Sequence, residues 1–245
     1  MHFPPINQFG SDECKLQTCL VRRKIKTILY NAVSMNREQI AELLEPFLES
    51  SSLSDQQLGS LAVYLELLVK WNSKLNLTAI RDPNEIVTRH FGESLFAARK
   101  LFPSGDSTQT AIGTAIDVGS GAGFPGLPIK LWTPSLKMTL VESNQRKATF
   151  LREVIRALKL EGMTVVTERA EKLSIKADLV TLRAVERFEQ VLPIAFNLKK
   201  PAGKLAILIG ASQIGAAQKI LSNAHWLVPI KVPNSSNRVL LVAES

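Results

Sequence analysis

The residues best suited to chemistry lie in one glycine-rich stretch near the middle of the chain, Thr114–Gly126. An apolar run at its start predicts a buried strand, which ends in a turn containing Gly119, Gly121 and Gly123. Glycines allow the positive φ of a tight strand-to-helix turn and let the backbone approach a ligand closely. The spacing therefore predicts a nucleotide-cofactor loop, without identifying the cofactor.

Two cofactor classes fit this loop. Gly121–Gly126 matches the G-x-G-x-x-G pattern of dinucleotide sites, so an oxidoreductase is one candidate. In such a site the pyrophosphate lies at a helix N-terminus, where a nearby carboxylate would repel it. Asp117 lies two residues before the first glycine, at the end of the strand. This carboxylate favours a cofactor that carries an ammonium and a sulfonium and no phosphate, which is S-adenosylmethionine.

A second acidic residue supports nucleotide binding. Glu142 ends the next predicted strand, where an acidic residue binds ribose hydroxyls in nucleotide-binding α/β folds. Both cofactor classes contain ribose, so Glu142 does not discriminate between them.

The segments around the loop alternate between short apolar runs and helical patterns from residue 111 onward, which predicts a mostly parallel sheet wound with helices. The gap between the last two runs is too short for a parallel crossover, so they should form an antiparallel hairpin. The seven predicted strands are 114–118, 138–142, 163–167, 178–182, 204–209, 226–231 and 238–243.

The sequence pattern of residues 35–110 predicts helices and no strands. Apolar residues recur at helical spacing over 36–48, Ser54–Gln57 forms a capping-box pattern, and Asp82–Pro83 supplies an N-cap followed by proline. We therefore expect an N-terminal helical region at 35–110, followed by an α/β domain at 111–245.

The overall charge is basic, with 30 lysines and arginines against 22 acidic residues and a formal net charge of +8. Such an excess favours a polyanionic partner such as nucleic acid. Part of it lies in residues 1–34, which lack apolar periodicity and are predicted to be a flexible basic tail.

Cysteine usage and hydropathy suggest a compartment. The two cysteines, Cys14 and Cys19, form no paired metal-ligand pattern, so we expect a reducing compartment and no metal. No apolar run is long enough for a membrane span and no signal peptide is visible, which predicts a soluble, cytoplasmic protein. We also expect a monomer.

The loop and its surroundings resemble one family in detail. Asp117-Val-Gly-Ser-Gly-Ala-Gly-Phe-Pro-Gly-Leu-Pro-Ile looks like the cofactor loop of the bacterial 16S ribosomal-RNA guanine-N7 methyltransferases of the glucose-inhibited-division B family. The resemblance runs from about Arg37 to the C-terminus. Further stretches match in order: Trp71–Thr78, Arg89-His90 with Glu93-Ser94, Phe150-Leu151, Arg169-Ala170-Glu171 and Arg183-Ala184-Val185.

The resemblance implies a Rossmann-like class I methyltransferase fold and transfer of a methyl group from S-adenosylmethionine to guanine N7 in the 530 loop of 16S rRNA. It implies that Arg183 faces the transfer site and that Asp117 and the glycine amides hold the methionine end. Glu142 would bind the ribose, and Ala170 with Glu171 the adenine. The implied cofactor-binding set is Asp117, Gly119, Gly121, Gly123, Phe124, Glu142, Ala170, Glu171 and Arg183.

Guanine N7 carries a free lone pair at neutral pH, so this reaction needs no general base. Catalysis would depend on holding the reactants in a near-attack geometry, with the guanine presented outside helical stacking. His90 is accordingly interpreted as a packing residue. Cations flanking the cofactor mouth are candidates for phosphate contacts: Lys70, Lys74, Arg81, Arg146 and Lys147.

Two departures from the family pattern keep an alternative open. Many members carry a lysine where this chain has Ile209, and an aspartate where it has Glu93. The alternative is a non-catalytic RNA-binding or ribosome-assembly factor that keeps the methyltransferase fold. A dinucleotide oxidoreductase is the third hypothesis.

Overall fold

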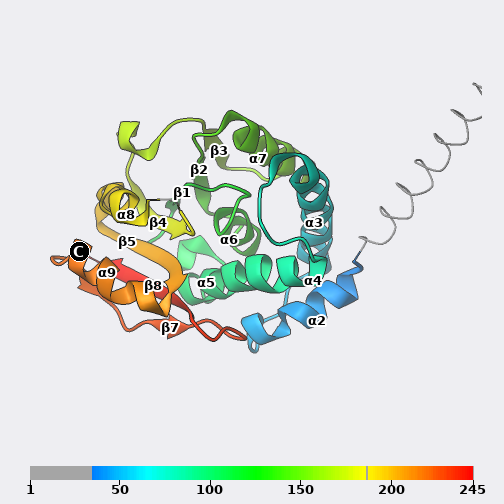
Figure 1. Cartoon of the computed structure of the whole chain (residues 1–245). Coiled ribbons are helices and arrows are strands. Elements are labelled where there is room, and N and C mark those ends of the chain that lie inside the picture. Colours follow the sequence, from blue (N-terminus) through cyan, green and yellow to red (C-terminus); the bar gives the residue numbers. More distant parts are fainter. Residues whose placement is uncertain (1–34, 186, 245) are drawn as a thin grey trace, which may run out of the picture. The chain divides into compact units, whose positions relative to one another are not determined.

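The centre of the fold is a mixed sheet in which five parallel strands continue into an antiparallel edge (Figure 1). The computed structural model describes residues 35–185 and 187–244, so the expectations for residues 1–34 lie outside the described part. The strand order is β3-β2-β1-β4-β5-β8-β6, and β7 also pairs with β8. The strands are β1 (Thr114–Val118), β2 (Lys137–Val141), β3 (Met163–Val166), β4 (Ala177–Arg183), β5 (Lys199–Gly210), β6 (His225–Trp226), β7 (Ile230–Lys231) and β8 (Arg238–Glu244).

The sequence predictions for the sheet are confirmed, with one error. The antiparallel hairpin is present, as β7 pairs with β8. The run 226–231, however, is not one strand: it forms β6 and β7, which pair with opposite ends of β8. Pro229 lies between them, and proline has no N–H to donate to a ladder. The sheet therefore has eight strands rather than seven.

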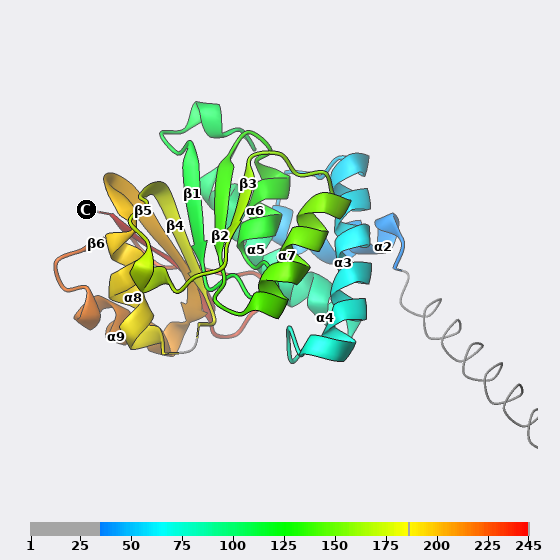
Figure 2. The ribbon, with the colours of Figure 1, turned by 90° about the horizontal axis from the view of Figure 1, so that it is seen from above.

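Helices cover both faces of the sheet (Figure 2). Alternate residues of a strand point to opposite faces: Ile116 and Val118 belong to the core under α8 and α9, and Ala115 to the core on the other side. The helices are α2 (Arg37–Leu48), α3 (Asp55–Leu75), α4 (Pro83–Ile86), the π-helix η1 (Val87–Gly92), α5 (Glu93–Leu101), α6 (Gly126–Trp132), α7 (Gln145–Ala157), α8 (Phe188–Asn197) and α9 (Ile214–Ile220), with 3-10 turns η2 (Ser107–Gln109), η3 (Ala170–Lys172) and η4 (Ala211–Gln213).

The predicted helix starts are confirmed. Ser54 and Gln57 form both hydrogen bonds of a capping box at the start of α3. The Asp82 carboxylate accepts from the Glu85 amide, and Pro83 is the first residue of α4. The helical stretch after Pro83 is not uniform, because the π-helix η1 separates α4 from α5.

The N-terminal helices share a hydrophobic core with the sheet. One buried cluster contains Tyr64 of α3, Phe91 of η1 and Phe150 of α7, together with residues of β1, β2, β4, β5 and β8. The aromatic rings of Tyr64 and Phe91 lie 5.0 Å apart. Residues 35–110 therefore help to build the core that supports the glycine loop.

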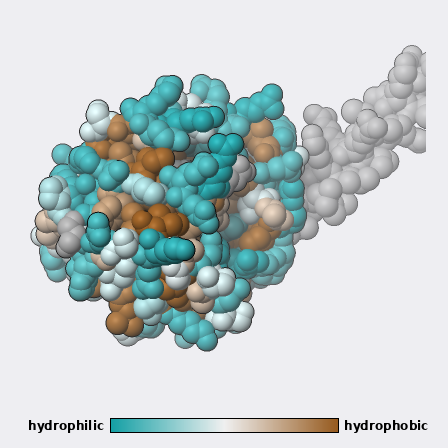
Figure 3. All heavy atoms as spheres, turned by 60° about the vertical axis from the view of Figure 1, so that its left-hand side comes forward, coloured by the Kyte–Doolittle hydropathy of each residue, from teal (hydrophilic) through white to brown (hydrophobic). Residues whose placement is uncertain are grey.

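The surface gives no sign of a membrane span. Within the described ranges, no helix is both long enough and apolar enough to cross a bilayer. The same residues hold no group of three or more histidine, cysteine, aspartate or glutamate side chains arranged for a metal ion. On the face shown in Figure 3, apolar residues form patches among hydrophilic ones.

Gly92 offers a test of the packing of the helices. A Cβ there would lie 2.6 Å from Cδ2 of Phe47, so Gly92→Ala should destabilise the fold by about 1–3 kcal/mol. Gly215, in α9, has open space around it, and Gly215→Ala should instead stabilise by up to about 1 kcal/mol. Chemical unfolding measures both, and equal effects would contradict the close packing of η1 on α2.

Candidate active site

A cavity of about 910 Å³ opens at the carboxyl ends of the parallel strands. Val118 of β1, Val141 of β2 and Arg183 of β4 line it. The chain passes from β1 to β2 and β3 on one side, and then returns to β4 on the other side. The cavity therefore lies at the point where the strand order reverses, which is where open α/β sheets bind ligands.

The glycine loop between β1 and α6 forms one wall of the cavity. Gly119, Gly121 and Gly123 all have positive φ, as the sequence pattern predicts. A Cβ on Gly119 would lie 2.8 Å from Val185 Cγ1, and one on Gly123 would lie 2.5 Å from the Tyr64 hydroxyl. Both glycines are thus required by close packing as well as by backbone conformation.

Several amides of this loop are engaged within the protein. Ser120 N donates to the carbonyl of Val141 at 3.0 Å, and Gly123 N donates to the carbonyl of Ser120 at 2.6 Å. Gly121 N donates to Glu142 Oε2 at 2.9 Å. A dinucleotide site offers its loop amides to a pyrophosphate. The occupied amides and the glutamate at this position therefore favour a cofactor without phosphate.

Asp117 lies beneath the loop and is fully buried. Its Oδ1 accepts from the Thr181 hydroxyl at 2.7 Å, and its Oδ2 accepts from Gly126 N at 3.3 Å. Burial raises the pKa of this carboxyl to about 6, against the lowering effect of those hydrogen bonds. Asp117 is not among the cavity-lining residues, so in this structure it fastens the loop to β4 and to the start of α6.

Glu142 lies on the cavity wall beside the loop. Its Oε1 accepts from Asn144 N at 2.7 Å, while Oε2 accepts from Gly121 N. A carboxylate oxygen can accept a second hydrogen bond, so Glu142 retains capacity for two hydroxyl groups. This arrangement fits a ribose.

The structure brings most of the expected cofactor-binding residues to this cavity. Gly123 lies behind the wall with Asp117, and the amides of Gly121 and Gly123 are already used. The residues on the wall are Gly119, Gly121, Phe124, Glu142, Ala170, Glu171 and Arg183.

Arg183 is buried at the end of β4. Its Nη2 donates to Glu93 Oε2 at 2.7 Å and to the Arg89 carbonyl at 2.5 Å, and its Nη1 contacts His90 Nδ1 at 3.1 Å. Burial lowers the pKa of the guanidinium, and the negative charge of Glu93 opposes this. Helices and sheet therefore meet at this one side chain.

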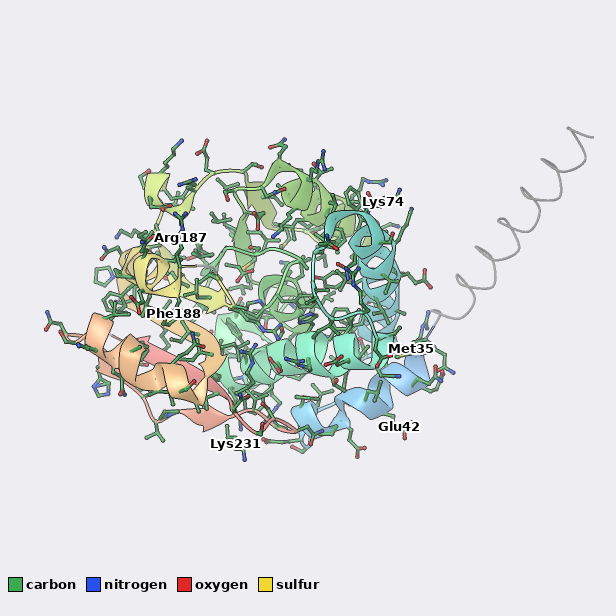
Figure 4. The ribbon with its side chains drawn as sticks, in the orientation of Figure 1. Met35, Glu42, Lys74, Arg187, Phe188 and Lys231 are labelled. Carbon is green, nitrogen blue, oxygen red and sulfur yellow. The ribbon has the colours of Figure 1, made fainter. Side chains whose placement is uncertain are left out.

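The five cations expected to contact RNA are dispersed. Lys147 lines the cavity, whereas Lys70, Lys74 and Arg146 are exposed outside it. Lys74 lies at the end of α3 in Figure 4. Arg81 is held by the end of that helix, because its guanidinium donates to the Asn72 carbonyl and to Asn76 Oδ1.

Several wall residues are not marked by the local sequence patterns. His90, which the sequence predicts to be a packing residue, lines the cavity together with four arginines outside the predicted set of RNA contacts. Antiparallel pairing with Gly210 brings Arg238 to the wall from β8, which no local pattern indicates. Ile209 is buried in the core under α8 and α9. The four arginines are Arg89, Arg169, Arg187 and Arg238.

The buried carboxyl of Asp117 makes stability depend on pH. The pKa of Asp117 is raised to about 6 in the folded protein. The protonated carboxyl therefore stabilises the fold fully below the unfolded pKa of 3.8, and this stabilisation is lost as the pH rises through 6. The stability of Asp117→Asn relative to native protein should therefore rise by about 2 kcal/mol between pH 4 and pH 7. Urea unfolding at both pH values measures this, with Glu66→Gln, on the exposed face of α3, as control. A difference that does not change with pH would contradict the raised pKa.

Known proteins with a similar sequence or fold agree with this geometry. The family model GidB, described as rRNA small subunit methyltransferase G, matches residues 57–226. The chain is 37% identical to ribosomal RNA small subunit methyltransferase G of Xylella fastidiosa, covering 86% of this chain and 97% of that protein. It is 36% identical to the protein of the same name from Chloroflexus aggregans, covering 78% and 82%.

Solved structures support the fold. A SAM dependent methyltransferase from Aquifex aeolicus superposes with a TM-score of 0.52 at 16% identity, over 69% of this chain and 96% of that one. A ribosomal protein L11 methylase from Lactobacillus delbrueckii superposes with a TM-score of 0.53 at 10% identity, over 64% and 78%. The fold is that of class I methyltransferases, and the chain belongs to the rRNA small subunit methyltransferase G family.

Proposed function

We propose that the protein transfers the methyl group of S-adenosylmethionine to N7 of a guanine in the 530 loop of 16S rRNA. The observation that carries the proposal is the cavity at the strand ends, where the Glu142 carboxylate accepts a hydrogen bond from the Gly121 amide of the glycine loop. Relatives named ribosomal RNA small subunit methyltransferase G support the substrate class. The working partner is then the small ribosomal subunit in the cytoplasm, with the enzyme acting as a monomer.

The residues on the wall have distinct roles in this proposal. Glu142 accepts hydrogen bonds from the ribose, and η3, with Ala170 and Glu171, borders the adenine. Gly119 and Phe124 shape the surface for the methionine end, while Asp117 keeps the loop in place from below. S-adenosylmethionine supplies an electrophilic methyl group, which guanine N7 accepts with its own lone pair.

The side chains at the cavity agree with a reaction that needs no general base. Among the described residues that line it there is no cysteine, and the histidine is His90. Burial lowers the pKa of His90 to about 3, with Arg183, Arg89 and Arg238 adding to the effect. We infer that Arg183 acts by orienting the guanine rather than by moving a proton.

The RNA would approach over a basic rim. Lys147, Arg169, Arg187 and Arg238 line the cavity mouth and can contact phosphates next to the target guanine. Arg187 lies at the start of α8 in Figure 4. Lys70, Lys74 and Arg146, on α3 and α7, would extend the basic surface outward. Arg81 would act through the turn that it holds.

The reaction can be tested with small subunits that lack the modification. Methyl-labelled S-adenosylmethionine should yield one 7-methylguanosine in the 530 loop, located by mass mapping of rRNA fragments. Asp117→Ala should abolish transfer, because it removes the carboxylate that holds the loop.

Two results would contradict the proposal. Methylation at another atom or base would refute the N7 assignment. Cofactor binding without transfer to naked RNA, assembly intermediates or finished subunits would favour the non-catalytic assembly factor. Full activity of Asp117→Ala would refute only the role of that residue.

Cofactor class can be tested independently by calorimetry. S-adenosylhomocysteine should bind the native protein, and NADH should not. Glu142→Gln should weaken the binding of S-adenosylhomocysteine roughly 10- to 100-fold, because a charged acceptor for the ribose hydroxyls is lost. The exposed Glu66→Gln on α3 should leave binding unchanged. Tight NADH binding would instead support the oxidoreductase hypothesis.

A further inference from the structure

The π-helix η1 departs from α-helical hydrogen bonding at one turn beside the cavity. Glu93 N donates to the carbonyls of Thr88 and His90 and not to that of Arg89, which an α-helix would use. The Arg89 carbonyl accepts from Arg183 Nη2 at 2.5 Å. The wide turn thus offers a helix carbonyl to a side chain of the sheet.

The same turn presents His90 to the other end of the guanidinium. His90 Nδ1 lies 3.1 Å from Arg183 Nη1, and His90 Nε2 lies 2.7 Å from the Thr78 hydroxyl. A guanidinium can only donate, so Nδ1 must accept and the ring proton must be on Nε2. The neighbouring arginine therefore selects the neutral Nε2–H tautomer.

One further contact holds the imidazole itself, and two more hold its partner Thr78. Its ring stacks on Phe124 of the glycine loop, with centroids 4.8 Å apart and an interplanar angle of 21°. Thr78, its partner at Nε2, also accepts from Ile80 N, and the Thr78 amide donates to Asn72 Oδ1. The turn after α3, η1 and the cofactor loop thus converge on one ring.

We propose that His90 is a positioning residue for methyl transfer. As a neutral acceptor it fixes the guanidinium of Arg183, together with Glu93 and the Arg89 carbonyl, in one orientation at the cavity wall. This role rests on the proposed function, because the orientation of Arg183 affects the reaction only through the guanine that Arg183 contacts. His90 itself neither transfers a proton nor contacts the methyl group.

Three substitutions separate the two ring nitrogens. In His90→Asn the amide oxygen lies where Nδ1 is and can accept from Arg183, whereas the contact with Thr78 is lost. In His90→Gln the longer side chain reaches toward Thr78 and loses Arg183. His90→Phe keeps the ring on Phe124 and loses both hydrogen bonds.

The readout is the single-turnover rate on unmodified small subunits at saturating S-adenosylmethionine. His90→Phe and His90→Gln should each slow transfer roughly 10- to 100-fold, while S-adenosylhomocysteine binds within about threefold of native. His90→Asn should recover the rate to within about fivefold of native. Equal rates for all three variants, or rates that follow their melting temperatures, would overturn the proposal.

A second measurement does not depend on activity. Nitrogen-15 NMR of the imidazoles, assigned with His90→Asn, should show His90 neutral and protonated at Nε2 from pH 5 to pH 8. A proton on Nδ1 would overturn the contact with Arg183. If the native protein transfers no methyl group, the proposed function fails, and the NMR still decides whether His90 holds Arg183.

Discussion

The structure depends above all on the buried ion pair between Arg183 and Glu93. The two side chains are about 5% and 4% exposed, and their charged atoms lie 2.7 Å apart. Removing one partner of such a pair leaves an unpaired buried charge, which costs about 3–5 kcal/mol. Because Glu93 begins α5 and Arg183 ends β4, this pair joins the N-terminal helices to the centre of the sheet.

The helices before the sheet are part of the site for the same reason. The Tyr64 hydroxyl of α3 donates to the Ala122 carbonyl in the glycine loop. Its ring stacks on Phe124 at 5.4 Å, and Phe124 stacks in turn on His90. These contacts hold the loop from the side opposite the sheet, so its shape depends on residues nearly sixty positions earlier in the chain.

Charge is arranged differently beneath the loop and at the cavity mouth. Below the loop, Asp117 is closed off from solvent by Thr181 and the start of α6. Beside the cavity, Arg183 of β4 and Arg238 of β8 flank the buried Glu93, with Arg183 Nη2 at 2.7 Å and Arg238 Nε at 3.6 Å from its Oε2. On the cavity wall, Glu142 and Glu171 suit a cationic cofactor, whereas Arg169, Arg187 and Arg238 suit a polyanion.

Local patterns in the sequence determined the parallel strands, the capped starts of α3 and α4, and the positive-φ glycines, because each depends on neighbours within a few residues. Tertiary structure decided the rest of the site. Packing between distant segments decides whether Asp117 faces the ligand or lies below it. The same packing decides which face of η1 carries His90 to the cavity. Arg238 reaches the wall only because β8 pairs with β5, and Arg183 is oriented by residues ninety positions away. No pattern of neighbouring residues encodes such contacts, since they form only when the helices close over the sheet.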